Sequence, residues 1–418
     1  MTTTKNNEHK KLNFSSEREQ SQACLNSAEH EKNQGRKVLN VPNLRFPEFQ
    51  GEWEKCKVSD LLDFYSTNSL SWDKLEYGTT NIQNLHYGLI HVGLPTMVDI
   101  DKDNLPNIID GNVPKNYELC KEGDIVFADA SEDTNEVAKA VEYYNLNGKK
   151  VVCGLHTIHG RDNKNKTVVG YKGYAFSSMS FHHQIRRIAQ GTKIYSINSK
   201  NFSECYVGIP SKDEQQKIAD LLRLIDERIA TQNKIIDKLQ SLIKGIGKQL
   251  FMDNQNWRTV KIGELLRIGN GKDYKHLSIG KIPVYGTGGQ MLLVNDYLYD
   301  GESVCIGRKG TIDTPMFLKG KFWTVDTLFY TYDFKDVLPK FCYYLFLQIN
   351  WKLYNEGTGV PSLSKSTIEN IKVKIPSLEQ QQKICSILDC YEHKTDNEEQ
   401  ILELYHSEKQ YLLRQMFI

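Results

Sequence analysis

Apolar residues recur at alternating spacings of four and three along two long segments of the chain. This spacing is typical of the seam of a coiled coil, so each segment is predicted to be one long amphipathic helix. The first seam runs through Ile218, Leu222, Ile225, Ile229, Gln232, Ile236, Leu239, Ile243, Ile246 and Leu250. The second, which is less pure, runs through Ile384, Leu388, Tyr391, Thr395, Glu398, Leu402, Tyr405, Lys409, Leu412 and Met416. The polar positions Gln232 and Glu398 occupy the same place in the two seams.

The two helical segments belong to a larger internal repeat. The stretch IPSKDEQQKI at 209–218 returns as IPSLEQQQKI at 375–384, and the same offset of 166 residues places Phe251 on Phe417. A second similarity lies at the start of each unit, at an offset of 204 residues. It relates Trp53, Lys57, Val58, Leu61 and Leu62 to Trp257, Lys261, Ile262, Leu265 and Leu266. The first globular segment therefore carries 38 more residues than the second. Shared ends with unlike middles suggest a constant scaffold that holds two different recognition surfaces.

Local signals place the start of each helix. Ser211 with Glu214, and Ser377 with Gln380, have the spacing of a capping box. The runs just before them, at 205–209 and 371–375, are rich in β-forming residues. Each globular segment is therefore predicted to end on a strand that leads into its helix.

We expect the two helices to pack on each other in an antiparallel pair. The globular domains would then lie at opposite ends of a rod roughly 57 Å long, at about 1.5 Å per residue. In the alternative, each helix covers only its own domain, which the sustained seam disfavours. The predicted division is a disordered tail at 1–40, a target-recognition domain at 41–209, a helical spacer at 210–252, a second recognition domain at 253–375 and a second spacer at 376–418.

Between the shared edges, short β-rich runs alternate with glycine. Residues 281–285 precede Gly286, and residues 303–306 precede Gly307. Such punctuation indicates strands joined by exposed loops. The predicted fold class is α/β (α+β), with two mixed α/β domains joined by two long antiparallel helices packed as a coiled coil.

Composition narrows the class of protein. A chain of 418 residues is long enough for at least two domains with cores of their own. The net charge of +1 requires any contact with a polyanion to come from local basic surface. Nine cysteines without zinc-ligand spacing fit a reducing compartment, and no apolar stretch approaches the roughly 20 residues of a membrane span. We therefore expect a cytoplasmic protein.

The second globular segment offers candidate DNA contacts in its loops. Arg308 and Lys309 lie between glycines that let a phosphate approach the backbone closely, although a solvated basic hairpin tip is the alternative interpretation. Glutamine, arginine and lysine read base edges, and threonine meets the thymine methyl group. The residues predicted to contact DNA are Lys272, Tyr274, Thr287, Gln290, Arg308, Lys309, Thr324 and Thr327.

The first globular segment offers a different set. The residues predicted to contact DNA are Tyr77, Thr79, His86, Ser131, His156, Thr157, Arg186 and Arg187. The two arginines either face phosphate or line a surface helix. The acids Asp129, Glu132 and Asp133 raise the alternative of a carboxylate-bound metal in a nuclease, but the second segment has no matching acidic pair. No metal ligand is therefore predicted.

Motifs of catalysis are missing from the sequence. There is no GxxxxGK[ST] phosphate loop, no HExxH and no nucleophile elbow. The Asn-Pro-Pro-aromatic and Asp-Pro-Pro-Tyr runs of amino-methyltransferases are also absent. The chain is therefore predicted to be a reader of a target without catalytic residues of its own.

The order of several short motifs resembles the specificity subunit of type I restriction-modification systems. The motifs are LRFPEF at 44–49, VYGTGG at 284–289, IGRKGT at 306–311, FWTVDT at 322–327, GTGVP at 357–361 with LSK at 363–365, and IPS at 375–377 with QQK at 381–383. The resemblance covers the chain from about residue 41 to its end. Each motif is modest alone, but their order and duplication are specific.

The resemblance implies two target-recognition domains, each reading one half of a split, asymmetric site on double-stranded DNA. It also implies two modification subunits that methylate adenine N6 with S-adenosylmethionine, and restriction subunits that cleave with ATP and magnesium. These cofactors would belong to the partners, and this chain would bind none. An alternative from another class is a coiled-coil scaffold whose two domains bind proteins. Protection of a bipartite DNA sequence would distinguish the two.

Overall fold

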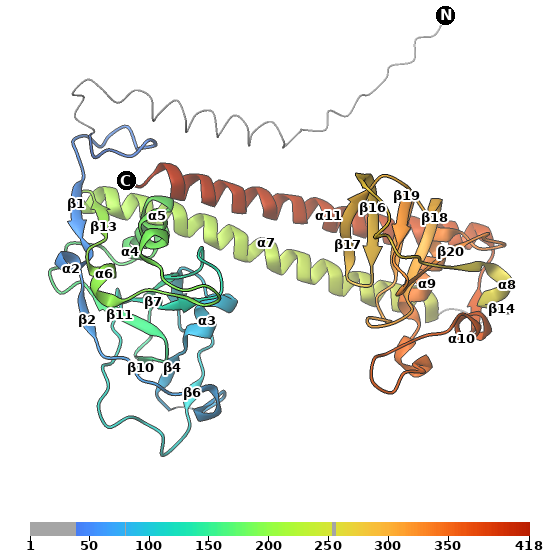
Figure 1. Cartoon of the computed structure of the whole chain (residues 1–418), viewed down its shortest axis with the longest axis horizontal. Helices are drawn as coiled ribbons and strands as arrows, with labels where there is room; N and C mark the ends of the chain where they lie inside the picture. The colour runs from blue at the N-terminus through green and yellow to red at the C-terminus, as the bar shows by residue number, and fades with distance from the viewer. Residues whose placement is uncertain (1–38, 80, 253–255) are drawn as a thin grey trace, which may run out of the picture. The chain divides into compact units, whose positions relative to one another are not determined.

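The computed structural model describes residues 39–79, 81–252 and 256–418 (Figure 1). The predicted disordered tail at 1–40 lies almost entirely outside the described residues. Contacts divide the chain into two compact units. Unit 1 comprises the chain up to Ala219 together with Leu413–Ile418, and unit 2 comprises Asp220–Leu412. No helix in the described ranges is long and apolar enough to cross a membrane.

Unit 1 is built on a mixed five-stranded sheet in the order β2-β11-β7-β9-β5, beside a four-stranded sheet in the order β10-β4-β6-β3. Its central strand β7 is buried at all four positions, as a strand covered on both faces should be. The strands are β1 Glu54–Lys57, β2 Asp63–Tyr65, β3 Leu75–Glu76, β4 Gln83–Leu85, β5 Met97–Asp99, β6 Asn107–Ile108, β7 Ile125–Ala128, β8 Ala130–Ser131, β9 Ala140–Asn145, β10 Val151–Cys153, β11 Thr157–Arg161, β12 Tyr195–Ser196 and β13 Tyr206–Ile209. The helices are α2 Val58–Leu61, η1 Trp72–Lys74, α3 Tyr87–Val92, α4 Tyr171–Phe176, α5 Met179–Ile188, α6 Ser199–Ser203 and the start of α7 Lys212–Met252.

Unit 2 is built on a six-stranded sheet in the order β15-β20-β18-β19-β16-β17, in which only the β16–β19 pair is parallel. The strands are β14 Arg258–Lys261, β15 Arg267–Asn270, β16 Ile279–Gly286, β17 Gly289–Val294, β18 Tyr299–Gly307, β19 Met316–Thr324, β20 Leu328–Tyr332 and β21 Lys372–Ile375. Its remaining helices are α8 Ile262–Leu265, α9 Pro339–Gln348, η2 Trp351–Tyr354, α10 Lys365–Asn370 and α11 Leu378–Gln415. The prediction of two mixed α/β domains is confirmed.

The shared edges of the repeat pair with each other in space. In unit 1 the first strand β1 pairs with the last strand β13, and in unit 2 β14 pairs with β21, both antiparallel. Glu54 lies opposite Ile209, and Arg258 lies opposite Ile375, so the register is the same in the two units. Each unit therefore ends on a strand that leads into its helix, as predicted.

A buried glutamine fixes the first turn of each helix to its own unit. The Gln215 side chain accepts from the Val168 amide at 2.9 Å and donates to the Lys166 and Pro210 carbonyls at 3.0 and 2.9 Å. Gln381, at the matching position, accepts from the Leu338 amide at 2.8 Å and donates to the Asp336 and Pro376 carbonyls at 2.9 and 3.1 Å. Both side chains are fully buried, which explains why this glutamine recurs in the repeat.

The predicted capping boxes form only in part. The Ser211 and Ser377 hydroxyls accept from the amides of Glu214 and Gln380, both at 3.4 Å. The Glu214 carboxylate does not return to the helix start. It accepts instead from the Arg45 guanidinium at 2.7 and 2.8 Å and from the Trp53 indole at 3.2 Å. A longer-range ion pair with Arg45 has replaced the local contact.

Within unit 2, helices α7 and α11 pack antiparallel through the predicted seams. Ile246 and Leu250 pack against the cluster that contains Ile384 and Leu388, and Asp226 lies 2.5 Å from Lys409. The buried seam positions include Leu222, Ile225, Gln232, Ile236, Leu239, Ile384 and Leu388, with Ile229, Tyr391, Glu398, Leu402 and Tyr405 half-buried, and in unit 1 Ile218 is also buried. Lys409, an odd residue for a seam, is explained by its ion pair with Asp226.

The two polar seam positions contact each other. The Gln232 amide donates to the Glu398 carboxylate at 2.6 Å and to the Glu398 carbonyl at 2.9 Å. An apolar residue in place of Gln232 would leave the half-buried Glu398 carboxylate without this donor. A shifted register of the two helices would also separate the pair, so this contact helps to fix the register of the seam.

We expect Gln232→Leu to lower the free energy of unfolding of the helix pair by about 1–2 kcal/mol, because it leaves a carboxylate without a partner. The double variant Gln232→Leu/Glu398→Leu should recover that loss, since two apolar groups replace a satisfied polar pair. Urea unfolding followed by helical circular dichroism measures both. The exposed Gln240→Leu is the control, and a double variant no more stable than the single one would contradict the prediction.

The repeated phenylalanine completes an aromatic cluster in each unit, but it comes from different places in the chain. In unit 2, Phe251 stacks on Phe341 at 5.3 Å and meets Trp257 edge-on at 5.7 Å. In unit 1 the matching ring is Phe417, which lies 6.3 Å from Trp53 and 6.0 Å from Tyr171. The Leu44 amide also donates to the Gln415 carbonyl at 2.9 Å. The last residues of the chain therefore complete the core of the first unit.

We expect Phe417→Ala to destabilise unit 1 by about 2–3 kcal/mol and to leave unit 2 unchanged, because the cavity opens in the unit 1 core. Phe251→Ala should do the reverse. Amide hydrogen exchange, resolved by peptide, measures the two units separately. Equal loss of protection in both units for either variant would show that this division of the core is wrong.

Candidate nucleic-acid interface

Unit 2 carries an open cleft of about 600 Å³ beside the predicted Arg308 and Lys309. Strand ends and loops from four parts of the unit form it. Its lining consists of Asn270, Arg308, Lys309, Asp326, Thr327, Phe329, Glu356, Ser362, Leu363, Ser364 and Lys365. Three of the predicted contacts, Arg308, Lys309 and Thr327, therefore share one surface.

Backbone hydrogen bonds hold the basic loop rigidly at this cleft. The Gly310 amide donates to the Pro361 carbonyl at 2.9 Å, and the Leu363 amide donates to the Arg308 carbonyl at 2.9 Å. Lys309 and Ser362 form an isolated β-bridge. Gly310 has φ +94° and a Cβ on Gly307 would lie 1.9 Å from the Thr311 carbonyl oxygen, so both glycines are required. The loop is thus a paired segment and not a free hairpin tip.

The unit 2 cleft combines cations with hydrogen-bond acceptors. Arg308, Lys309 and Lys365 stand with Asp326 and Glu356. Hydrogen bonds from Thr367 and Ser364 lower the pKa of Glu356, so this carboxylate stays ionised near neutral pH. Cations of this kind position phosphates, whereas a carboxylate accepts from the cytosine amino group. The cleft therefore has groups for both the backbone and the bases of a duplex.

Unit 1 carries a cleft of about 610 Å³ with different chemistry. It is lined by Tyr87, Gly88, His91, Val92, Ala130, Ser131, Glu132, Asp133, Glu136, Lys139, His156 and Ile194. His156 has φ 54°, its Nδ1 lies 3.1 Å from the Asp129 carboxylate, and its ring meets Tyr87 edge-on at 5.2 Å. Acids and histidines outnumber the one lysine here, in contrast to the cleft of unit 2.

The other predicted contacts divide into exposed and buried residues. Tyr77, Thr79, Arg186, Arg187, Lys272 and Gln290 are exposed, and Tyr274 and Thr287 are half-buried, but none of them lines either cleft. The arginines belong to the last turn of α5, where the Arg186 guanidinium contacts the Met179 sulfur at 3.4 Å. They lie on the exposed side of this helix, and their contact with phosphate stays a prediction.

Three of the predicted contacts require correction, because their side chains are buried. His86 is 3% exposed and caps α3 by accepting from the Gly88 amide at 3.2 Å. The Thr157 hydroxyl, 6% exposed, donates to the Gly154 carbonyl at 2.6 Å, and Thr324 is fully buried. The His86 and Thr157 side chains hold loops in place, and none of the three presents a surface to a duplex.

Sequence reasoning missed part of each cleft. In unit 2 the missed residues are Asn270, Asp326, Glu356, Ser362, Ser364 and Lys365, and in unit 1 they include His91, Glu136 and Lys139. The motif at 363–365 was a usable signal for Ser364 and Lys365. For the rest, no local pattern separates them from ordinary surface residues.

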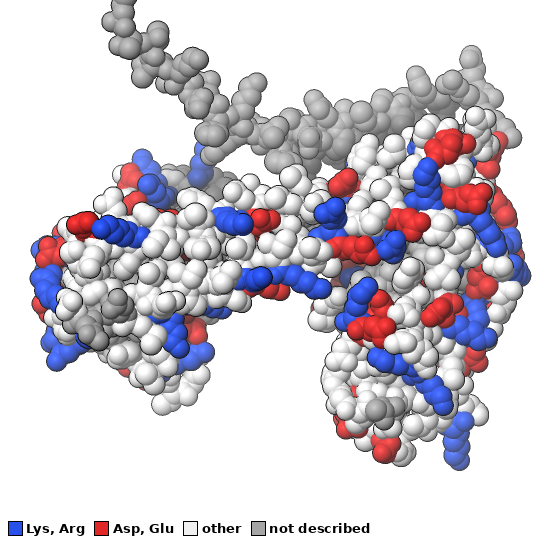
Figure 2. Space-filling view, turned by 180° about the vertical axis from the view of Figure 1, so that it is seen from behind, with Lys and Arg blue, Asp and Glu red and all other residues white. Residues whose placement is uncertain are grey.

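The acids of the alternative nuclease interpretation do not gather. Asp129 pairs with His156, and Asp133 accepts from the Asn135 amide at 2.9 Å. In the described ranges these acids form no group with ligand atoms within 4.8 Å of one another. On the face drawn in Figure 2, Lys and Arg are interspersed with Asp and Glu over each unit, so neither shows one continuous basic field there.

Comparison with known proteins agrees with the repeat. The family model of the type I restriction modification DNA specificity domain matches residues 51–241 and again 254–404. The chain therefore belongs to that family and carries its domain twice.

Relatives and solved structures extend the comparison. The chain is 24% identical over 420 residues to the putative type I restriction enzyme MjaX specificity subunit of Methanocaldococcus jannaschii, covering 87% of this chain and 93% of the relative. It is 28% identical over 141 residues to the EcoDI specificity subunit of Escherichia coli, covering 32% of this chain and 31% of the relative. The crystal structure of a type I S subunit from M. genitalium matches with TM-score 0.55 at 18% identity, covering 90% of this chain and 99% of that one.

The stability of unit 1 should fall with pH below neutrality. Burial and then the nearby His156 lower the pKa of His86, and burial and then Arg186 lower the pKa of His182. Below about pH 6.5 these two histidines are protonated in the unfolded chain but stay neutral in the folded one. Their contribution to the free energy of unfolding is therefore fully present above that pH and is lost as pH falls toward the folded pKa values. His86→Asn keeps a capping side chain and should reduce this dependence by about one proton.

Urea unfolding of unit 1 near neutral pH and about one to two pH units below it tests this prediction. The exposed His406→Asn in α11 is the control, and it should retain the pH dependence of the parent chain. If the free energy of unfolding of His86→Asn depends on pH as steeply as that of the control, the assignment to His86 is ruled out.

Proposed function

We propose that this chain is the DNA sequence-recognition subunit of a type I restriction-modification complex. It binds a bipartite, asymmetric site on double-stranded DNA and directs adenine-N6 methylation and cleavage by partner subunits. The observation that carries the proposal is the contrast between the two clefts. The frame of paired edge strands, buried glutamine and helix is the same in both units. One cleft has two histidines, three acids and one lysine, whereas the other has one arginine, two lysines and two acids.

Different clefts on equivalent frames favour two different half-sites. A duplicated unit with identical clefts would read a repeated or palindromic sequence, as symmetric dimers do. Here, the Arg308 guanidinium in the unit 2 cleft is a donor that suits guanine, and Ser131 and His156 in the unit 1 cleft suit mixed donor and acceptor edges. The two half-sites therefore differ in sequence.

The chemistry belongs to the partners in this proposal. The relatives are named specificity subunits, and the net charge of +1 leaves much of the phosphate neutralisation to other proteins. Two modification subunits supply S-adenosylmethionine and methyl transfer, and restriction subunits supply ATP- and magnesium-dependent cleavage. The chain itself is non-catalytic and holds none of these cofactors.

We expect Arg308→Ala or Lys309→Ala to weaken recognition of one half-site only, at a cost of about 1–3 kcal/mol for a base contact. His156→Ala should relax the other half-site. The measurement is the genomic pattern of N6-methyladenine in a host that expresses the chain with its modification subunit. The expected pattern for the parent chain is a split motif with methyladenine in each half.

Lys319→Ala is the matched control, because Lys319 is an exposed cation of unit 2 outside the cleft. It should leave the motif intact. Relaxation of both halves by Arg308→Ala would contradict the assignment of one cleft to one half-site. Absence of any split motif from the parent complex would overturn the proposal and favour a protein-binding scaffold.

A further inference from the structure

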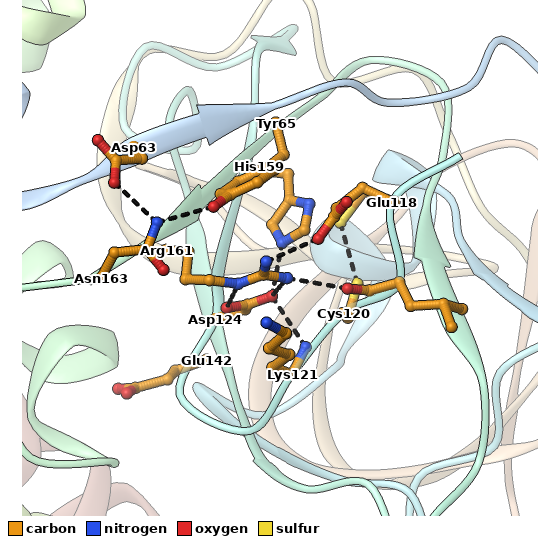
Figure 3. Close-up of polar contacts among 12 residues, drawn as sticks. Asp63, Tyr65, Glu118, Cys120, Lys121, Asp124, Glu142, His159, Arg161 and Asn163 are labelled. Carbon is orange, nitrogen blue, oxygen red and sulfur yellow. Dashed lines mark hydrogen bonds and ion pairs between the residues drawn. The ribbon is translucent and has the colours of Figure 1, made fainter. Parts of the chain in front are cut away.

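Three buried side chains of unit 1 gather where no DNA contact is predicted. Cys120, Cys153 and His159 each offer a ligand atom, and these atoms all lie within 4.8 Å of one another. The two sulfurs are 3.5 Å apart. The residues are 7%, 2% and 0% exposed, so the group is closed to solvent. Figure 3 shows Cys120 near the cluster that His159 and Arg161 form around Asp124.

The three residues come from segments that the fold holds firmly. Cys153 ends β10, His159 lies in the middle of β11, and Cys120 precedes β7. The Cys120 amide donates to the Val151 carbonyl at 2.8 Å, and Leu119 bridges Val152. Their separation is therefore set by backbone pairing.

The Asp124 carboxylate determines which ring nitrogen of His159 carries the proton and which has a free lone pair. The His159 Nε2 lies 2.7 Å from the Asp124 carboxylate, which also accepts from the Arg161 guanidinium at 2.8 Å. Because a carboxylate only accepts, it holds the imidazole proton on Nε2 and leaves a lone pair on Nδ1. This Nδ1 is buried and has no hydrogen-bond partner among the described residues. A carboxylate on one ring nitrogen and a free lone pair on the other is the arrangement of metal-bound histidines.

A second polar atom without a partner belongs to the same core. Tyr143 lies in one hydrophobic cluster with Cys120 and Cys153, and its hydroxyl is buried without a partner among the described residues. Its hydroxyl lies near Cys120 and Cys153 and is a candidate for a fourth ligand.

Two simpler explanations account for less of the structure. Reduced thiols packed in a core explain the burial but leave the His159 Nδ1 without a hydrogen-bond partner among the described residues, at a cost of about 1–3 kcal/mol. A Cys120–Cys153 disulfide would require the sulfurs to approach from 3.5 Å, and it would leave this nitrogen unsatisfied as well.

We propose that Cys120, Cys153 and His159 bind a structural zinc ion in the core of unit 1. Two thiolates and an imidazole whose ligand atoms lie within 4.8 Å of one another suit zinc. On binding, the two thiols lose their protons to the solvent, and the two thiolates balance the charge of Zn²⁺. The negative charge of Asp124 is offset by the positive charge of Arg161, so the buried site as a whole is neutral. The ion would join β10, β11 and the segment before β7, independently of DNA recognition.

The test measures metal content and cobalt spectroscopy on the full-length chain. Chain purified under reducing conditions without an affinity histidine tag should contain about one zinc per molecule. After chelation, one equivalent of Co²⁺ should give the visible absorption of tetrahedral cobalt and a thiolate charge-transfer band. Cys120→Ser/Cys153→Ser should lower bound zinc by at least about tenfold, because both soft ligands are removed.

Cys390→Ser is the matched control, since Cys390 is an exposed cysteine of α11 and should keep the metal. If the double variant does not fold, the cobalt titration of the parent chain decides alone. Parent chain without bound zinc and without a cobalt–thiolate spectrum would overturn the proposal. So would a folded double variant that retains the metal, or a Cys120–Cys153 disulfide found by mass spectrometry.

Discussion

The pairing of the first strand of each unit with its last strand determines the placement of everything else. β1 with β13, and β14 with β21, close the two units in the same register. Each closing strand leads within a few residues into a long helix, and a fully buried glutamine, Gln215 or Gln381, bonds the helix start to a neighbouring loop and to the preceding proline. A buried amide without its partners is costly, so the helix cannot shift without losing several hydrogen bonds at once.

This constraint separates the frame that the two units share from the surface in which they differ. Because the frame is made by the ends of each unit, the residues between them can change without moving the helix. Between these shared ends the two units differ: their main sheets have different numbers and orders of strands, and their clefts differ in charge. A specificity protein needs this property, since new targets require new clefts on an unchanged support.

The candidate site shows the limit of local reasoning. The loop chemistry singled out Arg308, Lys309 and Thr327 as separate candidates, and the structure brings all three to one cleft. The same reasoning failed for His86, Thr157 and Thr324, which are polar loop or strand-end residues by sequence and buried in the structure. A polar side chain near a turn faces either solvent or an unpaired backbone group, and only the packing of distant segments decides which. Glu356 joined the cleft from about fifty residues away for the same reason.

The sequence by itself determined the repeat, the two helical seams, the strands that lead into the helices and the matched polar pair Gln232 and Glu398. These features depend on residue periodicity and on comparison of the chain with itself, so they are readable without coordinates. Only the tertiary structure decided that Phe417 completes the core of unit 1, that Lys409 pairs with Asp226, and that Cys120, Cys153 and His159 meet in the core. Each of these contacts joins segments that are remote in sequence or carry no motif spacing, and its formation depends on the three-dimensional path of the backbone between them.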